Sequence, residues 1–312
     1  YLGGIKSILW IDSIQFFVYL LGGMISIYYI SLDLPSGAVL NTFGNSINTI
    51  FHYEGSILRD SSLLINGIIG GTFLSFASHG ADYMMVQRSL SCSNLSAARK
   101  AMIGSGIFVF IQFSIFLLLG SLLTEFFKMQ NFESLGISLD YVDSNWNVLK
   151  DREFPLFINY FLDPGVRGIL LVGVLSAAMS TISSSINSLS SSTVRDLLNV
   201  KDDIKLSKTI SIFWAFALIF IASFFDESNN LLLITGLRIA SFTYGILLSL
   251  FLLSLFKIKP KDIYVIFGSI CGIMSVFIMQ SYDISWTWYI LVATFVTMTI
   301  SISLSLIFGH KR

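Results

Sequence analysis

The chain contains a series of apolar segments, each about 20 residues long, which is the length that an α-helix needs to cross a bilayer. Of its 312 residues, 54% are hydrophobic and 12% are charged, whereas soluble globular domains carry roughly 25% charged residues. So little polar surface predicts an all-α integral membrane protein that contacts the lipid bilayer. Eight transmembrane helices are expected, over residues 8–31, 63–87, 101–124, 167–193, 208–225, 231–256, 262–280 and 286–308.

Lys and Arg are distributed unequally between the expected loops, and cytoplasmic loops are enriched in both. With the N-terminus inside, thirteen of the nineteen fall in inner segments and five in outer loops. We therefore expect a protein of the plasma (cytoplasmic) membrane with both chain ends in the cytoplasm. The outer loops are 32–62 and 125–166, and the second contains "EFPLFINYFLDPG", which predicts a short amphipathic helix that ends at Asp163-Pro164-Gly165.

Several classes of function are disfavoured. Cys92 and Cys271 lie on different elements and form neither a metal-binding nor a disulfide pattern. The formal net charge is zero, which argues against binding to nucleic acid. The chain lacks the H-E-x-x-H and G-x-S-x-G motifs of intramembrane or other hydrolases, so no enzyme and no cofactor are expected. An ion channel remains an alternative, but eight helices with a discontinuous polar stripe favour a carrier.

The segment "LSAAMSTISSSINSLSSSTVRD", residues 175–196, continues an apolar run and yet is rich in hydroxyls. On a helix that starts from Ala177, one face carries Ser180, Thr181, Ser184, Ser188 and Ser191. Hard cations such as Na⁺ need several oxygen ligands. Small and hydroxyl residues also allow helices to pack closely in membranes, so ion binding and packing both remain open.

Asp12 lies within the apolar run "SILWIDSIQFF". A charge at membrane depth is costly and usually functional. By helical rise, the Asp12 carboxylate lies at a depth from which it could reach Ser183 and Ser184. The alternative is an acid at the N-terminal end of a helix, where the helix dipole stabilises it.

The expected helix 63–87 carries Gly70-Gly71 and Gly80-Ala81, pairs at which helices approach closely or a helix deforms. It also carries His79 and Asp82. His79 is expected to be a hydrogen-bond partner between helices more often than a proton relay. Asp82 is expected to pair with Arg88 or with a neighbouring helix.

Three segments together resemble the sodium:solute symporter family, which includes sodium-coupled sugar, proline, sialic acid and monocarboxylate carriers. They are "GGIKSILWIDSIQ", "ASHGADYMMVQRSLSCSNLSAARKA" and "GILLVGVLSAAMSTISSSINSLSSSTVRD". The resemblance implies that residues 1–256 hold core helices 5–10 of the LeuT-type inverted-repeat fold. Residues 257–312 would hold two peripheral helices, and the whole of 1–312 would be one partial transmembrane domain.

The resemblance also implies the sites. One sodium ion would be held at Ala177, Ser180 and Thr181, and a second at Asp12, Ser180, Ser183 and Ser184. The residues expected to contact substrate or to form a gate are Phe76, His79, Asp82, Tyr83 and Arg238. About five helices would precede residue 8, and because the first residue is not Met we expect those helices of the same transporter to be required as partners.

The expected function is sodium-coupled symport of a small organic solute. Tyr83 stands where many members of the family have Gln, which disfavours a glucose-type site, although a neutral sugar remains the alternative. Arg238 is the one Lys or Arg that lies away from the ends of an expected span, and a guanidinium there could bind a carboxylate bidentately. A sialic-acid-like sugar acid or a monocarboxylate is therefore the expected solute, unless Arg238 extends outward or pairs with an outer Asp.

Overall fold

A computed structural model describes residues 4–50, 54–149, 151–200, 203–224, 232–256 and 259–308, and it describes the side chains of all of these except 4–9 and 46–50. The expected helix ends at 225 and 231 and the predicted boundary at 257 lie outside the described residues. The same holds for the following cations used to orient the chain: Lys150, Lys201, Lys257, Lys311 and Arg312.

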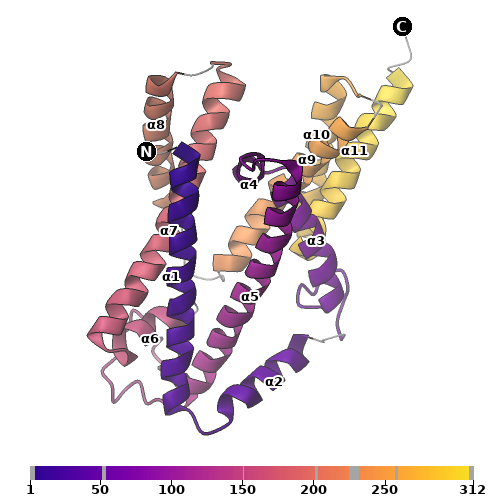
Figure 1. The fold of residues 1–312 in the computed structure, drawn as a ribbon. Coiled ribbons are helices and arrows are strands. Elements are labelled where there is room, and N and C mark those ends of the chain that lie inside the picture. Colours follow the sequence, from indigo (N-terminus) through magenta and orange to yellow (C-terminus); the bar gives the residue numbers. More distant parts are fainter. Residues whose placement is uncertain are drawn as a thin grey trace. The chain divides into compact units, whose positions relative to one another are not determined.

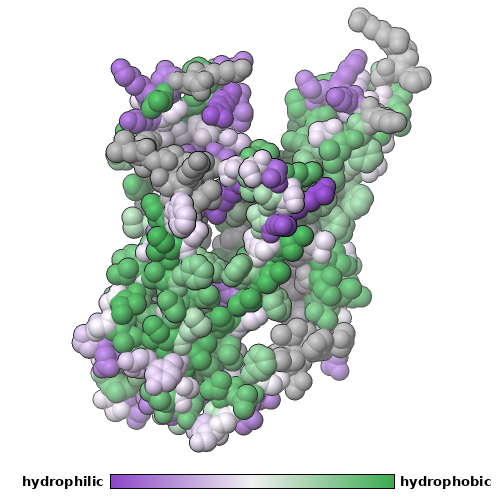
Figure 2. All heavy atoms as spheres, viewed as in Figure 1, coloured by the Kyte–Doolittle hydropathy of each residue, from purple (hydrophilic) through white to green (hydrophobic). Residues whose placement is uncertain are grey.

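Seven helices of the described residues are long and apolar enough to cross a membrane, and each overlaps an expected span. They are α1 (Gly4–Asp33), α5 (Leu95–Lys128), α7 (Pro164–Ser192), α8 (Ile204–Ala222), α9 (Leu232–Leu255), α10 (Asp262–Ser281) and α11 (Tyr289–Phe308). Large apolar side chains along them, such as Phe110 at 74% and Phe216 at 68% exposure, face outward, as lipid contact requires. Figure 2 shows this hydrophobic surface along the helices, with hydrophilic residues gathered near helix ends.

The remaining expected span, 63–87, is discontinuous, which corrects the prediction of an unbroken helix. α3 (Leu64–Gly80) ends next to Ala81, and α4 (Tyr83–Leu90) begins after Asp82. The backbone N–H groups of Ala81 and Asp82 both donate to the Ala77 carbonyl, so the helical hydrogen bonds of α3 end there. The Gly80-Ala81 pair therefore marks the position at which the helix deforms.

The chain forms two compact units. Unit 1 contains residues 1–46 and 91–230, and unit 2 contains 47–90 and 231–312. α2 (Ala38–Ile50), which the sequence did not predict, runs across the boundary between them. The division into core residues 1–256 and peripheral residues 257–312 stays a prediction.

In unit 1, α1 packs against α7 and α5, and α7 packs against α8 (Figure 1). The predicted amphipathic helix is confirmed as α6 (Glu153–Phe161), and α7 begins at Pro164. At this end of the unit the ring of Phe126 contacts those of Phe157 and Phe161 edge-on. These rings belong to a buried apolar cluster that joins α5, α6 and the loop between them, so the segment 125–166, predicted to be an outer loop, is a packed structure.

In unit 2, α9, α10 and α11 pack together and α3 contacts α9. Small residues allow the close approach: a Cβ added to Gly245 of α9 would meet the Ala293 Cβ at 2.5 Å and the Ile290 carbonyl at 3.0 Å. A short 3₁₀ turn, η2 (Trp286–Trp288), precedes α11 and contacts α3. Close contacts at small residues are typical of helices that associate in membranes.

Candidate functional site

The hydroxyl-rich face of α7 meets the acid of α1 in unit 1. Ser180 Oγ donates a hydrogen bond of 2.5 Å to Asp12 Oδ1, across 168 residues of sequence. Both side chains are half-buried. α1 begins at Gly4, so Asp12 lies about 12 Å along the helix and not in its first turn. The geometry thus favours a functional acid over an acid that caps the helix N-terminus.

The other predicted sodium ligands lie around this pair on α7. Ser184 is buried one turn beyond Ser180, on the same face. Thr181 Oγ1 donates to the Ala177 carbonyl at 3.3 Å. Ser183 is exposed, and its side chain forms no hydrogen bond with any described residue. The structure therefore brings Asp12 and Ser180 together with Ser184 next to them, and leaves Ser183 at the edge.

Gln15 adds an oxygen that the sequence analysis did not single out. It follows Asp12 by three residues and thus lies on the same face of α1. Its Oε1 is buried and has no hydrogen-bond partner within the described part of the chain. A buried amide oxygen without a partner is costly, so this face of α1 offers an unused acceptor within one turn of Asp12.

Hydroxyls at the C-terminal end of α7 and in the turn that follows it contact α8. Ser190 is buried and donates to the Ser207 carbonyl of α8 at 2.9 Å. The indole N–H of Trp214, also on α8, donates to Thr193 Oγ1 at 2.9 Å; Thr193 begins the π-helical turn η1 (Thr193–Leu197). Of the two uses left open by the sequence, packing is observed near the C-terminal end of α7, where hydroxyls contact α8. Ion binding by the oxygens near α1 stays a prediction.

Asp82 lies at the break between α3 and α4 in unit 2, and its carboxylate accepts two hydrogen bonds there. Its Oδ1 accepts a hydrogen bond of 2.8 Å from the Met84 backbone N–H, so it caps the first turn of α4. Its Oδ2 accepts a hydrogen bond of 2.6 Å from the Tyr244 hydroxyl of α9. The expected partner on a neighbouring helix is thus Tyr244, which the sequence analysis missed. The signal was a phenol inside a span, which usually needs a polar partner.

The other predicted substrate or gate residues of α3 and α4 lie close to this break. His79 Nδ1 is within hydrogen-bond distance of the Ser78 hydroxyl at 2.9 Å and the Ser75 carbonyl at 3.1 Å. Its partners therefore lie within its own helix. The rings of Phe76 and Phe251 of α9 meet edge-on. Tyr83 is the first residue of α4 and is half-buried.

The two hydrogen bonds of Asp82 predict an order of stability among variants. Tyr244→Phe removes one bond to a charged group, worth about 1.5 kcal/mol or more, whereas Asp82→Ala also removes the cap of α4, worth about 1 kcal/mol. We expect Asp82→Ala to lower the melting temperature of the purified protein more than Tyr244→Phe. An equal loss in the two variants would show that the cap contributes nothing.

Arg238 lies on α9 and lines a cavity of about 180 Å³ in unit 2. Arg59, from the segment before α3, and Asp283, from the turn after α10, line the same cavity. Arg238 forms no ion pair with Asp283 or with any other described residue. The structure therefore places beside Arg238 a second guanidinium that no sequence pattern connected with it.

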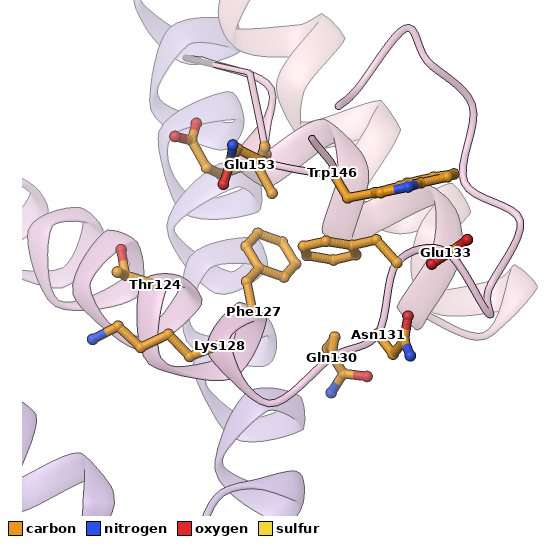
Figure 3. Close-up of a pocket in the computed structure, with 11 residues that line it drawn as sticks. Thr124, Phe127, Lys128, Gln130, Asn131, Glu133, Trp146 and Glu153 are labelled. Carbon is orange, nitrogen blue, oxygen red and sulfur yellow. The ribbon is translucent and has the colours of Figure 1, made fainter. Parts of the chain in front are cut away.

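A larger cavity, of about 750 Å³, lies in unit 1 between the end of α5 and the start of α6. None of the predicted site residues lines it. Figure 3 shows the ring of Phe127 in the middle of the lining and polar side chains such as Gln130 and Glu153 around it. Lys128, which also lines it, forms an exposed ion pair of 2.7 Å with Glu125.

Within the described ranges, no group of three or more His, Cys, Asp or Glu side chains is arranged to hold a metal ion. The oxygens gathered between α1 and α7 are of another kind: one carboxylate together with hydroxyl and carbonyl groups. Such a set can hold a hard monovalent cation weakly and release it again.

The family model "sodium:solute symporter family" matches residues 1–272. The chain belongs to the sodium:solute symporter family. Members of this family are transporters and not enzymes, and sodium is their coupling ion. The chain is accordingly an integral membrane protein, and the family predicted from three sequence segments is confirmed.

Similar proteins include a sodium/sialic acid symporter of Proteus mirabilis, 24% identical over 88% of this chain and 56% of the relative. A human sodium-coupled monocarboxylate transporter 1 is 27% identical over 63% of this chain and 31% of the relative. The chain thus spans between about a third and just over half of the length of these relatives.

Among solved structures, the chain is similar to a Na⁺-coupled sialic acid symporter in a substrate-bound, outward-open state, with a TM-score of 0.74 and 20% identity. The match covers 98% of this chain and 63% of the solved one. It confirms the predicted LeuT-like fold.

Proposed function

We propose that the transporter that includes this chain couples the entry of Na⁺ to the uptake of a small carboxylate-bearing organic solute across the plasma membrane, with both ends of this chain in the cytoplasm. The observation that carries the proposal is the contact between Ser180 of α7 and Asp12 of α1. It joins two of the segments on which the family resemblance rests, at the position where the resemblance implies a sodium ion.

One sodium ion is proposed to bind at Ala177, Ser180 and Thr181. The Thr181 hydroxyl proton is directed to the Ala177 carbonyl, so the lone pairs of Thr181 remain available to a cation. The Ala177 carbonyl also retains a second lone pair. Neutral oxygens of this kind bind Na⁺ without trapping it, as a coupling ion requires.

A second sodium ion is proposed to bind at Asp12, Ser180, Ser183 and Ser184. Because the Ser180 hydroxyl donates its proton to Asp12, both of its lone pairs can face a cation, and the carboxylate supplies the charge. The burial of Ser184 supports this arrangement. The solved relative is described as revealing a novel Na⁺ site, which is consistent with more than one ion.

The solute is proposed to be a carboxylate because the similar proteins are sodium-coupled sialic acid and monocarboxylate transporters. The residues proposed to contact it or to form a gate are Phe76, His79, Asp82, Tyr83 and Arg238. Because the chain spans between about a third and just over half of the length of its relatives, we propose that further helices of the same transporter complete these sites.

Competition tests the class of solute. Uptake of a labelled monocarboxylate by the transporter that includes this chain is expected to be inhibited by sialic acid or short monocarboxylates, and not by glucose or galactose at the same concentration. The assay compares residual uptake at a tenfold excess of each competitor. Inhibition by the neutral sugars alone would favour the sugar alternative.

A further inference from the structure

We propose that the cavity lined by Arg59 and Arg238 in unit 2 binds the carboxylate group of a small organic anion and acts as a capture site for the transported solute. The inference rests on the proposed function for its choice of solute, and it adds a site and a residue, Arg59, that the function does not require.

The segment that carries Arg59 is fixed in place on both sides of that residue. The Ser285 backbone N–H donates to the Leu58 carbonyl at 2.7 Å. The indole N–H of Trp288 donates to the Ile57 carbonyl at 2.9 Å. Both donors belong to the region of η2, so the residues before Arg59 are held beside a segment that itself lines the cavity.

A buried amide holds the residues that flank Arg59 from the other side. Asn66 of α3 is fully buried, and its Nδ2 donates to the carbonyls of Ile57 and Asp60 at 2.6 Å each. Backbone positions held by three separate donors lose little entropy when a ligand binds. The Arg59 backbone is therefore preorganised, which favours affinity.

The charges that line the cavity sum to one positive charge, from Arg59 and Arg238 against Asp283. None of these three side chains forms an ion pair or a hydrogen bond with another described residue. Because two guanidinium groups and one carboxylate share the lining, an anion in the cavity would balance the remaining positive charge. A planar carboxylate is the anion that matches the fork of a guanidinium.

The lining of the cavity also contains an indole ring. Trp286 lines the cavity, and its Nε1 is buried without a hydrogen-bond partner within the described residues. Because that nitrogen has almost no accessible surface, Trp286 contributes its ring to the lining of the cavity and not a donor. At about 180 Å³ the cavity is smaller than the roughly 300–1,000 Å³ typical of drug-sized ligands. It thus suits a short acid, or the carboxylate end of a larger solute.

The place of the cavity in the unit agrees with capture. It lies where the segment before α3 meets the turn between α10 and η2, and the distribution of Lys and Arg predicts that this end faces outside. A positive cavity there raises the local concentration of anions and their association rate. Removal of Arg59 is therefore expected to raise KM for a carboxylate and to leave kcat unchanged.

Trp286 provides a direct readout of binding. The transporter in nanodiscs is titrated with lactate, and in parallel with lactamide, in sodium-free choline buffer at constant ionic strength, while tryptophan fluorescence is recorded. The part of the signal that disappears in Trp286→Phe reports the cavity. We expect a saturable response to lactate and none to lactamide, with the apparent Kd raised at least fivefold in Arg59→Gln and in Arg238→Gln.

Lys261→Gln is the matched control, because it removes one exposed positive charge of the same unit at the N-terminus of α10, away from the cavity. It is expected to keep the wild-type Kd. Asp283→Asn is expected to tighten lactate binding because it removes the one negative charge of the lining. An equal response to lactamide, or a wild-type Kd in Arg59→Gln, would overturn the inference.

The same variants separate this inference from the proposed function. Sodium-dependent uptake with no Trp286 response, and with an unchanged KM in Arg59→Gln, would overturn the capture site and leave the proposed function intact. Lactate binding in sodium-free buffer by a transporter whose uptake ignores sodium would overturn the proposed function and leave the cavity as a carboxylate site.

Discussion

Replacement of Ser180 and Thr181 together by alanine is expected to raise the sodium concentration for half-maximal uptake at least several-fold. The Ser180 hydroxyl contacts Asp12 of α1, and the Thr181 hydroxyl bonds to the Ala177 carbonyl next to it on α7. The loss of one hydrogen-bonding group from a charged partner costs about 1.5 kcal/mol or more, and every 1.4 kcal/mol is roughly a factor of ten in affinity. Water that enters the site offsets part of this cost. The measurement is uptake against sodium concentration at fixed solute.

Ser190→Ala is the control, since Ser190 is a hydroxyl of the same helix that is bonded to the Ser207 carbonyl of α8. It is expected to lower the melting temperature slightly and to leave the sodium dependence unchanged. A double variant of Ser180 and Thr181 with wild-type sodium dependence would remove the sodium site from α7.

The substitution Asp12→Asn is expected to lower the cooperativity of sodium activation, with the Hill coefficient falling from near two towards one. Asparagine keeps an acceptor for the Ser180 hydroxyl but removes the charge. An interaction with an ionised group is worth about 1.5–3 kcal/mol, so the second ion would bind on the order of 10–100-fold more weakly. Hill analysis of uptake against sodium concentration measures the change.

Asp203→Asn is the matched substitution, because Asp203 caps α8 through the Leu206 backbone N–H and asparagine caps helices equally well. It is expected to leave both the Hill coefficient and the stability unchanged. If Asp12 were only an acid near a helix end, its variant would behave in the same way, apart from a modest loss of expression.

The spans could be predicted, and the residues of the proposed sodium site could be grouped, because both steps depend on local patterns. Apolar length determines where a helix crosses a membrane, and the spacing of Ser180, Thr181 and Ser184 places them near one face of a helix. An acid inside an apolar run needs a partner, and so Asp12 pointed to the hydroxyls of another helix. Its contact with Ser180 agrees with that reasoning.

Features that depend on tertiary contacts could not be predicted in the same way. The hydropathy of 63–87 shows no interruption, so it does not reveal the break. The break lies at Asp82, whose carboxylate accepts hydrogen bonds from the Met84 backbone N–H and the Tyr244 hydroxyl. α5 extends to Lys128, beyond its predicted end at 124, because its last turn packs into the aromatic cluster around Phe126.

The neighbourhood of Arg59 and Arg238 depends on how two distant segments fold together. The nearly 180 residues between them carry no pattern that indicates contact. Arg59 was assigned to an outer loop, where a cation is unremarkable, and Arg238 to the interior of a span. Only the anchoring of Ile57 and Leu58 beside η2 brings both guanidinium groups to one cavity.

Uptake driven by a sodium gradient alone tests the central claim most directly. The transporter that includes this chain is reconstituted in liposomes, and a labelled carboxylate is followed with sodium outside and choline inside. The account predicts accumulation above the external concentration, which a sodium ionophore abolishes. The double variant Ser180→Ala, Thr181→Ala is expected to reach the same accumulation only at a higher sodium concentration. Equal accumulation in choline, or a sodium requirement that is the same in the double variant, would contradict it.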